Sequence, residues 1–257
     1  MIAKERQQQI LDLLNEQRIV TVQGLADFFS VAVITVRRDL DALAREGLIK
    51  KIYGGATLPD EKKSSLENVQ YASRAVDYLD EKQAIAAAAI DLISKGETIF
   101  LDTGTTVNEL AKRIQSRSDL TVVTNSLAVV NELMDSSVQL FCIGGWIGRE
   151  QLSFTSDVTL SCLNAFCFDH CFCGAGGVSV QKGITDYRHE TIQQRKTILE
   201  RSASSILLAE SNKFGKTAPF VVAPFSAFDL VITDASLSED HKRAMSAAGI
   251  SYLAVEV

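Results

Sequence analysis

The sequence has little of several residue types that mark special classes of protein. Only 3 of its 257 residues are proline, 15 are glycine, and aromatic residues make up 7% with a single tryptophan. Together with 46% hydrophobic and 23% charged residues, this composition excludes a disordered, collagen-like or low-complexity chain. A globular protein of one large or two modest domains is expected.

Long apolar runs are also lacking. The most apolar helical stretch, AIAAAAIDLI at 84–93, is too short to span a bilayer and contains Asp91. Charged residues interrupt the first eighteen positions, where a secretory signal would need an uninterrupted apolar region. The five cysteines are an odd number, which favours reduced thiols. We expect a cytoplasmic protein that does not engage membranes.

Positive charge is scarce overall but unevenly distributed. The chain has 26 basic and 32 acidic residues, a net charge of -6, which alone suggests a cytosolic enzyme rather than a polycation. Residues 1–57 carry eight basic and seven acidic side chains, whereas the remainder carries eighteen and twenty-five. A small, locally basic module therefore precedes an acidic body.

Three short apolar stripes at helical spacing follow one another in the basic module. They are Ile10, Leu13 and Leu14; Val22, Leu25 and Phe29; and Val36, Leu40 and Leu43. Only residues 30–32 separate the second and third helices, as in a helix-turn-helix, and Thr21 is expected to cap the second. The segment LIKKIYGGATL after Gly47 predicts a two-stranded wing.

The third helix has a cationic face opposite its apolar stripe. Steps of 100° per residue place Ile34, Arg38, Asp41 and Arg45 on that face. Such a helix fits the DNA major groove, where Arg donates two hydrogen bonds to guanine and neighbouring cations neutralise phosphates. The predicted DNA-contacting residues are Thr35, Arg37, Arg38, Arg45, Lys50, Lys51 and Tyr53. An ordinary solvated helix and a helix-turn-helix for protein contacts are the alternatives, and the second leaves the cationic cluster unexplained.

The acidic body follows a polar segment at 58–76 that predicts a linker. Beyond Asp80, helical patterns alternate with strand patterns at 98–102, 121–125, 138–145, 168–177, 204–209, 220–223, 230–234 and 251–256. This alternation predicts an α/β domain with a mostly parallel sheet covered on both faces, whose ligands bind beyond the carboxyl ends of the strands. The expected domains are 1–57 and 77–257, joined by the linker.

The segment LDTGTTVNEL at 101–110 predicts an anion cradle. A strand ends at Asp102, Gly104 permits a tight turn, and Thr105 and Thr106 place hydroxyls and free N–H groups at a helix start. The segments TNS at 124–126, GG at 144–145 and GAGG at 174–177 also end strands, and Lys213 could supply a cation. Walker A and dinucleotide fingerprints are lacking, so no cofactor is indicated.

Six segments follow one another along the chain: TVRRDLDALAREGLIKKIYGGATL at 35–58, LDTGTT, TNSL, GG, GAGGV and NKFG. In this order they resemble the DeoR-type family of bacterial transcriptional regulators, and the resemblance covers essentially the whole chain. The resemblance implies a winged helix-turn-helix that binds double-stranded operator DNA. It also implies a sensor domain resembling sugar-phosphate isomerases in fold, which binds a phosphorylated sugar without chemistry. Such proteins are homo-oligomers, here a dimer or tetramer, and commonly repress carbohydrate catabolic genes until the effector releases them, although an activator stays open.

The effector-binding residues expected from the motifs and the resemblance come from several separate loops. They are Asp102, Gly104, Thr105, Thr106, Thr124, Asn125, Gly144, Gly145, Gly174, Glu190 and Lys213. The chain departs from the family pattern at Ala32, where a Ser usually opens the recognition helix, at Glu210, usually Asp, and at Gln194, where a Lys is usual. These departures leave the identity of the sugar open.

Three other interpretations concern residues of the acidic body. Asp102, Asp186 and Glu190 could serve an isomerase, but fusion to a DNA-binding module argues against turnover. Trp146 could stack on a sugar or anchor a loop. A third cluster, which could suggest a metal site, comprises Cys162, Cys167, His170, Cys171 and Cys173. Its spacing and the position of two of its cysteines on an apolar strand favour core packing, so no metal is expected.

Overall fold

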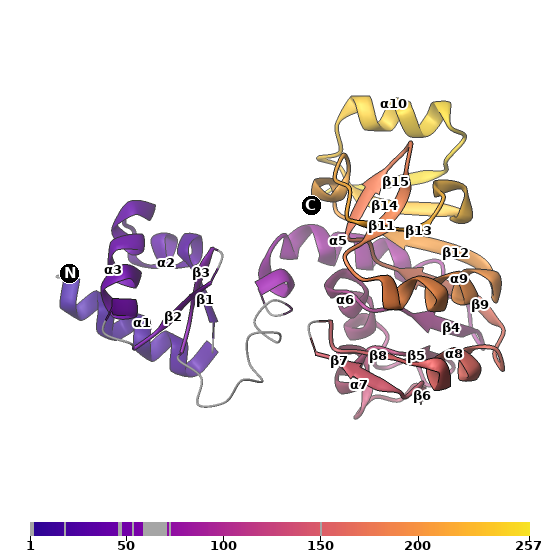
Figure 1. The fold of residues 1–257 in the computed structure, drawn as a ribbon, viewed down its shortest axis with the longest axis horizontal. Helices are drawn as coiled ribbons and strands as arrows, with labels where there is room; N and C mark the ends of the chain where they lie inside the picture. Colours follow the sequence, from indigo (N-terminus) through magenta and orange to yellow (C-terminus); the bar gives the residue numbers. More distant parts are fainter. Residues whose placement is uncertain are drawn as a thin grey trace. The chain divides into compact units, whose positions relative to one another are not determined.

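The computed structural model of the chain (Figure 1) describes residues 3–17, 19–45, 48–52, 54–58, 71, 73–149 and 151–257. The chain divides into two compact units, Met1–Arg74 and Ala75–Val257. Most of the predicted linker, like Gly47, lies outside the described residues, so the predicted domain limits at 57 and 77 stay predictions. None of the helices described is long and apolar enough to cross a membrane.

The first unit contains the three predicted helices and a small sheet. The helices are α1 (Ala3–Gln17), α2 (Val22–Phe29) and α3 (Val33–Arg45), and the strands are β1 (Ile19–Thr21), β2 (Lys50–Ile52) and β3 (Gly55–Thr57). The predicted wing is present as β2 and β3, but β1 also pairs with β3, so the sheet has three antiparallel strands in the order β1-β3-β2. A three-residue strand between two helices is too short to leave a period in the sequence.

The turn between α2 and α3 has the local chemistry that a helix-turn-helix needs. The hydroxyl of Thr21 accepts a hydrogen bond from the Gly24 N–H at 3.0 Å and caps α2, as predicted. Ser30 ends the helix in the left-handed conformation, with φ of 53°. The apolar stripe of α3, Val36, Leu40 and Leu43, is buried as expected, and it packs with Ile10, Leu14 and Leu25 in one core.

A buried ion pair joins α1 to α3 within this core. The Arg6 Nε lies 2.5 Å from the Asp39 Oδ2, and the two side chains are 9% and 5% exposed. Gln7 donates a second hydrogen bond to the Asp39 Oδ1 at 3.1 Å. Because Asp39 lies on the inner side of α3, the pair fixes how the helix is rotated and which residues it presents to solvent.

The second unit is built on a seven-stranded parallel sheet in the order β15-β14-β12-β9-β4-β5-β6. Its strands are β4 (Thr98–Leu101), β5 (Thr121–Thr124), β6 (Gln139–Cys142), β9 (Phe168–Cys173), β12 (Ser202–Leu208), β14 (Leu230–Asp234) and β15 (Tyr252–Val255). The parallel sheet is confirmed, and most of its strands lie where the apolar patterns predicted them.

Helices cover both faces of the sheet because successive strand residues point to opposite sides. Ile99 and Leu101 pack with α5 (Leu79–Ile90), α6 (Thr105–Arg113) and α7 (Leu127–Leu133) in one apolar cluster. Phe100 lies on the other face, in a second cluster with residues of α8 (Asp157–Leu163), α9 (Ile192–Glu200) and α10 (Glu239–Ala247). Two buried layers therefore leave the strand ends as the place for polar chemistry.

One predicted strand of the second unit lies outside the parallel sheet, and four short strands were not predicted. The stretch 220–223 does form a strand, β13 (Phe220–Ala223), but it pairs antiparallel with β11 (Gly183–Asp186) in a separate sheet with β10 (Gly177–Ser179). A hairpin of β7 (Trp146–Gly148) and β8 (Ser153–Thr155) follows β6. An apolar pattern predicts a strand but does not identify its partner, which explains the error at β13.

The Arg6–Asp39 pair makes a prediction about the stability of the first unit. Arg6→Met leaves the Asp39 carboxylate buried without its cation, so the free energy of unfolding of this unit should fall by about 3 kcal/mol. Lys51→Met, which removes one partner of an exposed ion pair, is the matched control and should leave that free energy nearly unchanged. Denaturant titration of both variants measures the difference, and equal stability would contradict the role given to the pair.

Candidate DNA-binding surface and effector site

The exposed side of α3 carries the predicted cationic residues. Arg37, Arg38 and Arg45 are exposed, Thr35 is half-buried, and Ile34 is 57% exposed. Their neighbours on α3, Val36 and Leu40, face the core. The helix therefore combines a fixed apolar side with a free side that carries three guanidinium groups and one apolar side chain.

The wing is attached to α3 through its own charges. Lys51 of β2 lies 2.5 Å from the Asp41 carboxylate of α3, and both side chains are about half-exposed. The hydrogen bond from Lys51 holds the pKa of Asp41 below its ordinary value. Lys50 is exposed beside it, and Tyr53 lies outside the described residues. A phosphate contact by Lys51 would compete with its bond to Asp41.

The predicted effector loops meet at one edge of the parallel sheet. Leu101 of β4 pairs with Phe172 of β9 on one side and with Thr124 of β5 on the other. The residues after these strands therefore lie side by side, and a Cβ built on Gly104 would lie 4.0 Å from the Cα of Gly174. Gly104 has a φ of 145°, a conformation that side chains rarely adopt, and it directly precedes α6.

The first turn of α6 has the properties of an anion cradle. Thr105 and Thr106 begin the helix, no side chain caps it, and the first N–H groups of any helix have no partner inside it. The helix dipole adds a positive potential at this end. The Thr106 hydroxyl donates to the Glu210 Oε1 at 3.2 Å, so a loop beyond β12 reaches the same turn.

The second loop, after β5, contains two polar side chains whose hydrogen bonding differs. The Thr124 hydroxyl donates to the Leu101 carbonyl at 2.6 Å and accepts from the Ser126 N–H, so it holds the loop in shape. Asn125 is 2% exposed, and its amide nitrogen donates to Gln194 at 3.3 Å and to the Phe154 carbonyl at 3.4 Å. Its Oδ1 is buried and has no hydrogen-bond partner in the described part of the chain.

The third loop, after β6, is packed against the start of α8. The Thr159 hydroxyl donates to the Gly144 carbonyl at 2.7 Å. A Cβ on Gly145 would lie 2.2 Å from the same hydroxyl oxygen, so only glycine permits this approach. Trp146 follows with its side chain 81% exposed, which does not fit a ring that anchors the loop by burial.

Two further predicted residues lie on 3-10 turns. Lys213 ends η2 (Ser211–Lys213), is half-buried, and donates its backbone N–H to the Glu210 carbonyl at 2.9 Å. Glu190 lies in η1 (His189–Thr191) before α9. Its side chain is 53% exposed and lies 3.5 Å from the ring of His189. Glu190 is thus the most solvent-exposed of the charged residues predicted for the site.

A buried arginine that the sequence analysis did not single out lies behind the phosphate turn. The Arg195 Nε donates to Asp102 at 2.7 Å, its Nη1 donates to Asp186, and all three side chains are buried. Burial raises the pKa of Asp102 despite Arg195. Burial also acts on Asp186, but the attraction of Arg195 and the hydrogen bond from the Tyr187 N–H outweigh it and lower that pKa. Both carboxylates are ion-paired with Arg195, so neither is a free base of the kind that an isomerase needs.

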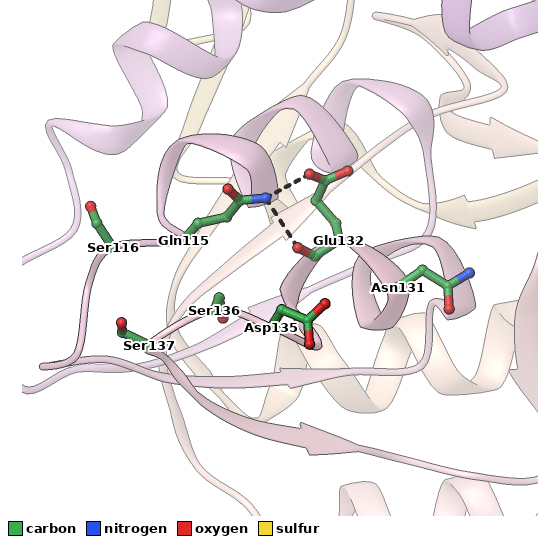
Figure 2. Close-up of a pocket in the computed structure, with 7 residues that line it drawn as sticks. All are labelled: Gln115, Ser116, Asn131, Glu132, Asp135, Ser136 and Ser137. Atoms are coloured by element: carbon green, nitrogen blue, oxygen red, sulfur yellow. Dashed lines mark hydrogen bonds between the residues drawn. The ribbon is translucent and has the colours of Figure 1, made fainter.

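A surface depression and the suspected metal cluster lie apart from the predicted effector loops. A depression of about 380 Å³ follows the far ends of α6 and α7, where Gln115 donates to the carbonyl and the carboxylate of Glu132 at 3.1 and 2.7 Å (Figure 2). In the suspected metal cluster, Cys171 and Cys173 are buried in the core, whereas Cys162 and Cys167 are exposed. Within the described ranges no group of His, Cys, Asp or Glu could hold a metal ion.

Fold and surface together define a class of protein. A small unit with an exposed cationic helix and a wing is joined to an α/β unit whose polar side chains converge beyond the strand ends, as in a DNA-binding regulator with a small-molecule sensor. The family model "DeoR-like helix-turn-helix domain" matches residues 6–62, and "DeoR C terminal sensor domain" matches residues 78–235. The chain therefore belongs to the DeoR family of transcriptional regulators, as the motifs indicated.

Two relatives named as repressors match this chain over most of their length. The glycerol-3-phosphate regulon repressor of Escherichia coli K12 is 31% identical over 90% of both chains. The putative aga operon transcriptional repressor of Escherichia coli O157:H7 is 28% identical over 98% of this chain and 93% of the other. A ribose 5-phosphate isomerase structure from Methanocaldococcus jannaschii is 17% identical, with a TM-score of 0.40 over 53% of this chain and 54% of that one. A likeness of that size assigns no activity.

The Arg195 cluster predicts a pH-dependent loss of stability. Arg195→Met leaves Asp102 and Asp186 buried without a cation, so the free energy of unfolding at pH 7 should fall by about 3 kcal/mol or more. Both carboxyl pKa values then rise because burial is no longer opposed. The folded variant takes up protons that the unfolded chain does not bind, so its deficit should shrink between pH 7 and about pH 5.

Denaturant titrations at several pH values measure this trend. The control is Arg243→Met, which removes one partner of an exposed pair with Asp240 and should change stability little at any pH. A deficit of the Arg195 variant that stays constant with pH would show that the two carboxylates are not what the arginine compensates.

Proposed function

We propose that this regulator is a repressor of a carbohydrate operon and that a phosphorylated sugar, bound at the carboxyl edge of the parallel sheet, releases it from operator DNA. The observation that carries the proposal is the joint position of an uncapped helix start and a buried, unpartnered amide oxygen on adjacent loops. The first suits an anion and the second suits a hydroxyl group, and a sugar phosphate offers both.

The phosphate end of the ligand is assigned to α6. The backbone N–H groups and hydroxyls at Gly104, Thr105 and Thr106 would receive it, and Lys213 would supply a cation from η2. Asp102 does not contact the ligand in this proposal, because its carboxylate is bound to Arg195. It holds the turn in place instead.

The hydroxyl end of the ligand is assigned to amide oxygens. Asn125 Oδ1, Asn108 Oδ1 and Asn212 Oδ1 are buried and have no hydrogen-bond partner among the residues described. A buried acceptor without a partner costs about 1–3 kcal/mol, and a sugar hydroxyl that donates to it removes this cost. Asn125 is held in position through Gln194, the residue that replaces the lysine usual in the family.

DNA binding is assigned to α3 and the wing. Arg37 and Arg38 would enter the major groove, with Arg45, Lys50 and Lys51 at the flanking phosphates. The exposed Ile34 suits a thymine methyl group at the start of the helix. A single helix of this size reads few base pairs, so we propose that a homo-oligomer presents two such helices to two half-sites.

Regulation follows from a linkage between two arrangements of the protein. The effector favours an arrangement in which the paired recognition helices no longer match the operator spacing. Each tenfold preference of the effector for that arrangement shifts the equilibrium by about 1.4 kcal/mol. The relatives named as repressors of the glycerol-3-phosphate regulon and the aga operon support a role of this kind.

Substitutions in the two units should separate the two activities. Lys213→Ala should keep the affinity for DNA and lose release by the sugar phosphate, because the anion loses a cation. Arg38→Ala should weaken DNA binding and its dependence on salt while effector binding stays normal. Gel-shift titration with the DNA upstream of the operon, and thermal-shift screening with pentose and hexose phosphates, measure both.

Matched controls are available in each unit. Lys216→Ala removes an exposed lysine from the loop that follows Lys213, and Lys4→Ala removes one from α1. Neither should change DNA binding or effector response. A Lys213 variant that lost DNA affinity and effector binding together would contradict a separate sensor site, and turnover of any sugar phosphate would contradict the proposal as a whole.

A further inference from the structure

A second buried charge cluster lies at the same edge as the phosphate turn. Its cation is Lys82 of α5, a residue that no motif marked. The Lys82 Nζ lies 3.5 Å from the Glu210 Oε1, and the two side chains are 3% and 4% exposed. The same oxygen accepts the hydrogen bond of the Thr106 hydroxyl at 3.2 Å. One carboxylate oxygen therefore touches both the first turn of α6 and a buried ammonium group.

Glu210 occupies the position that suits an anion. It stands at the positive end of α6, next to Thr106, and its backbone carbonyl accepts from the Lys213 N–H. Burial lowers the pKa of Lys82, Glu210 opposes this, and the positive charge of Lys213 lowers the pKa further. The Lys82 ammonium group is thus held beside the carboxylate at this helix start, and a second anion here would relieve its repulsion by Lys213.

Lys82 also contacts the first residues of the sensor unit. Its ammonium group donates a hydrogen bond to the backbone carbonyl of Asp77. The next residue, Tyr78, has the left-handed φ of 55°, and its carbonyl accepts from the Lys82 N–H at 3.1 Å. Asp77 lies just beyond the boundary between Arg74 and Ala75, where the two units meet along the chain. Lys82 thus holds the segment through which the sensor unit is joined to the DNA-binding unit.

We propose that Glu210 is an internal anion that the effector phosphate displaces, and that Lys82 transmits this displacement to the segment 77–79. The inference rests on the proposed function. A phosphate at the first turn of α6 competes with Glu210 for Thr106 and attracts the Lys82 ammonium. The bond from Lys82 to the Asp77 carbonyl then weakens, and the turn at Tyr78 is released from the arrangement that the bond maintains.

The first test concerns competition by Glu210 and uses the full chain with inorganic phosphate as the probe. Glu210→Gln removes the internal anion but keeps its shape. It also removes the carboxylate that compensates the buried Lys82, so the variant should be less stable, and circular dichroism checks that it is folded. The affinity of the folded variant for phosphate should rise by about tenfold, the value expected for losing one charged hydrogen bond. Calorimetric titration at constant ionic strength measures it. Glu200→Gln, an exposed carboxylate at the end of α9, is the control and should behave as the unaltered protein. An affinity that is unchanged or lower in Glu210→Gln overturns the proposal.

The second test concerns transmission through Lys82. Hydrogen exchange of the backbone amides in 75–82 should increase when phosphate binds the unaltered chain. In the double variant Lys82→Met/Glu210→Gln no buried charge is left alone, so the protein should fold, and phosphate should no longer change exchange in this segment. The same phosphate response in the double variant overturns the role of Lys82.

The outcomes separate this inference from the proposed function. If the unaltered chain binds phosphate or sugar phosphates but exchange in 75–82 does not respond, the inference fails and the proposed effector site stands. If the unaltered chain binds neither, the proposed function fails as well.

Discussion

Parallel pairing of β9, β4 and β5 is the constraint on which the sensor unit depends. Parallel neighbours end at the same edge, so the residues after Leu101, Thr124 and Cys173 are brought together although they are far apart in the sequence. A parallel sheet must also be covered on both faces, which explains why the unit has two apolar clusters. Polar groups that converge at this edge are therefore available for a ligand.

Two buried cations at this edge, Arg195 and Lys82, are each compensated by carboxylates. Arg195 binds two carboxylates and ties α9 to β4 and β11, whereas Lys82 is paired with Glu210. A buried charge without a partner would cost several kcal/mol, so each of these groups restricts what its partner can do. The same ion pairs that give the site its shape withdraw Asp102 and Asp186 from acid-base chemistry. This arrangement supports the proposal that the unit binds its ligand without converting it.

Local signals in the sequence predicted the parts whose structure is determined locally. The stripe of α3, the Thr21 cap and the Gly-Thr-Thr turn depend on residues a few positions apart, and the structure agrees with each of them. The sheet assignment of β13 was wrong because strand pairing depends on distant residues. Arg195 was missed for the same reason, since its partner Asp102 is 93 positions away. A polar stretch such as TIQQRK is typical of an exposed helix until its partners are known.

The bond between Lys51 and Asp41 has a consequence for how the protein searches a chromosome. A carboxylate in the middle of the cationic face of α3 repels the phosphate backbone whenever the helix approaches DNA in a wrong position. In the proposed docking, Lys51 would contact a phosphate and Asp41 would lie opposite a donor such as a cytosine amino group. Asp41 would then weaken binding to random DNA more than binding to the operator. In a chain whose net charge is -6, this would add discrimination to the attraction that a few basic side chains supply.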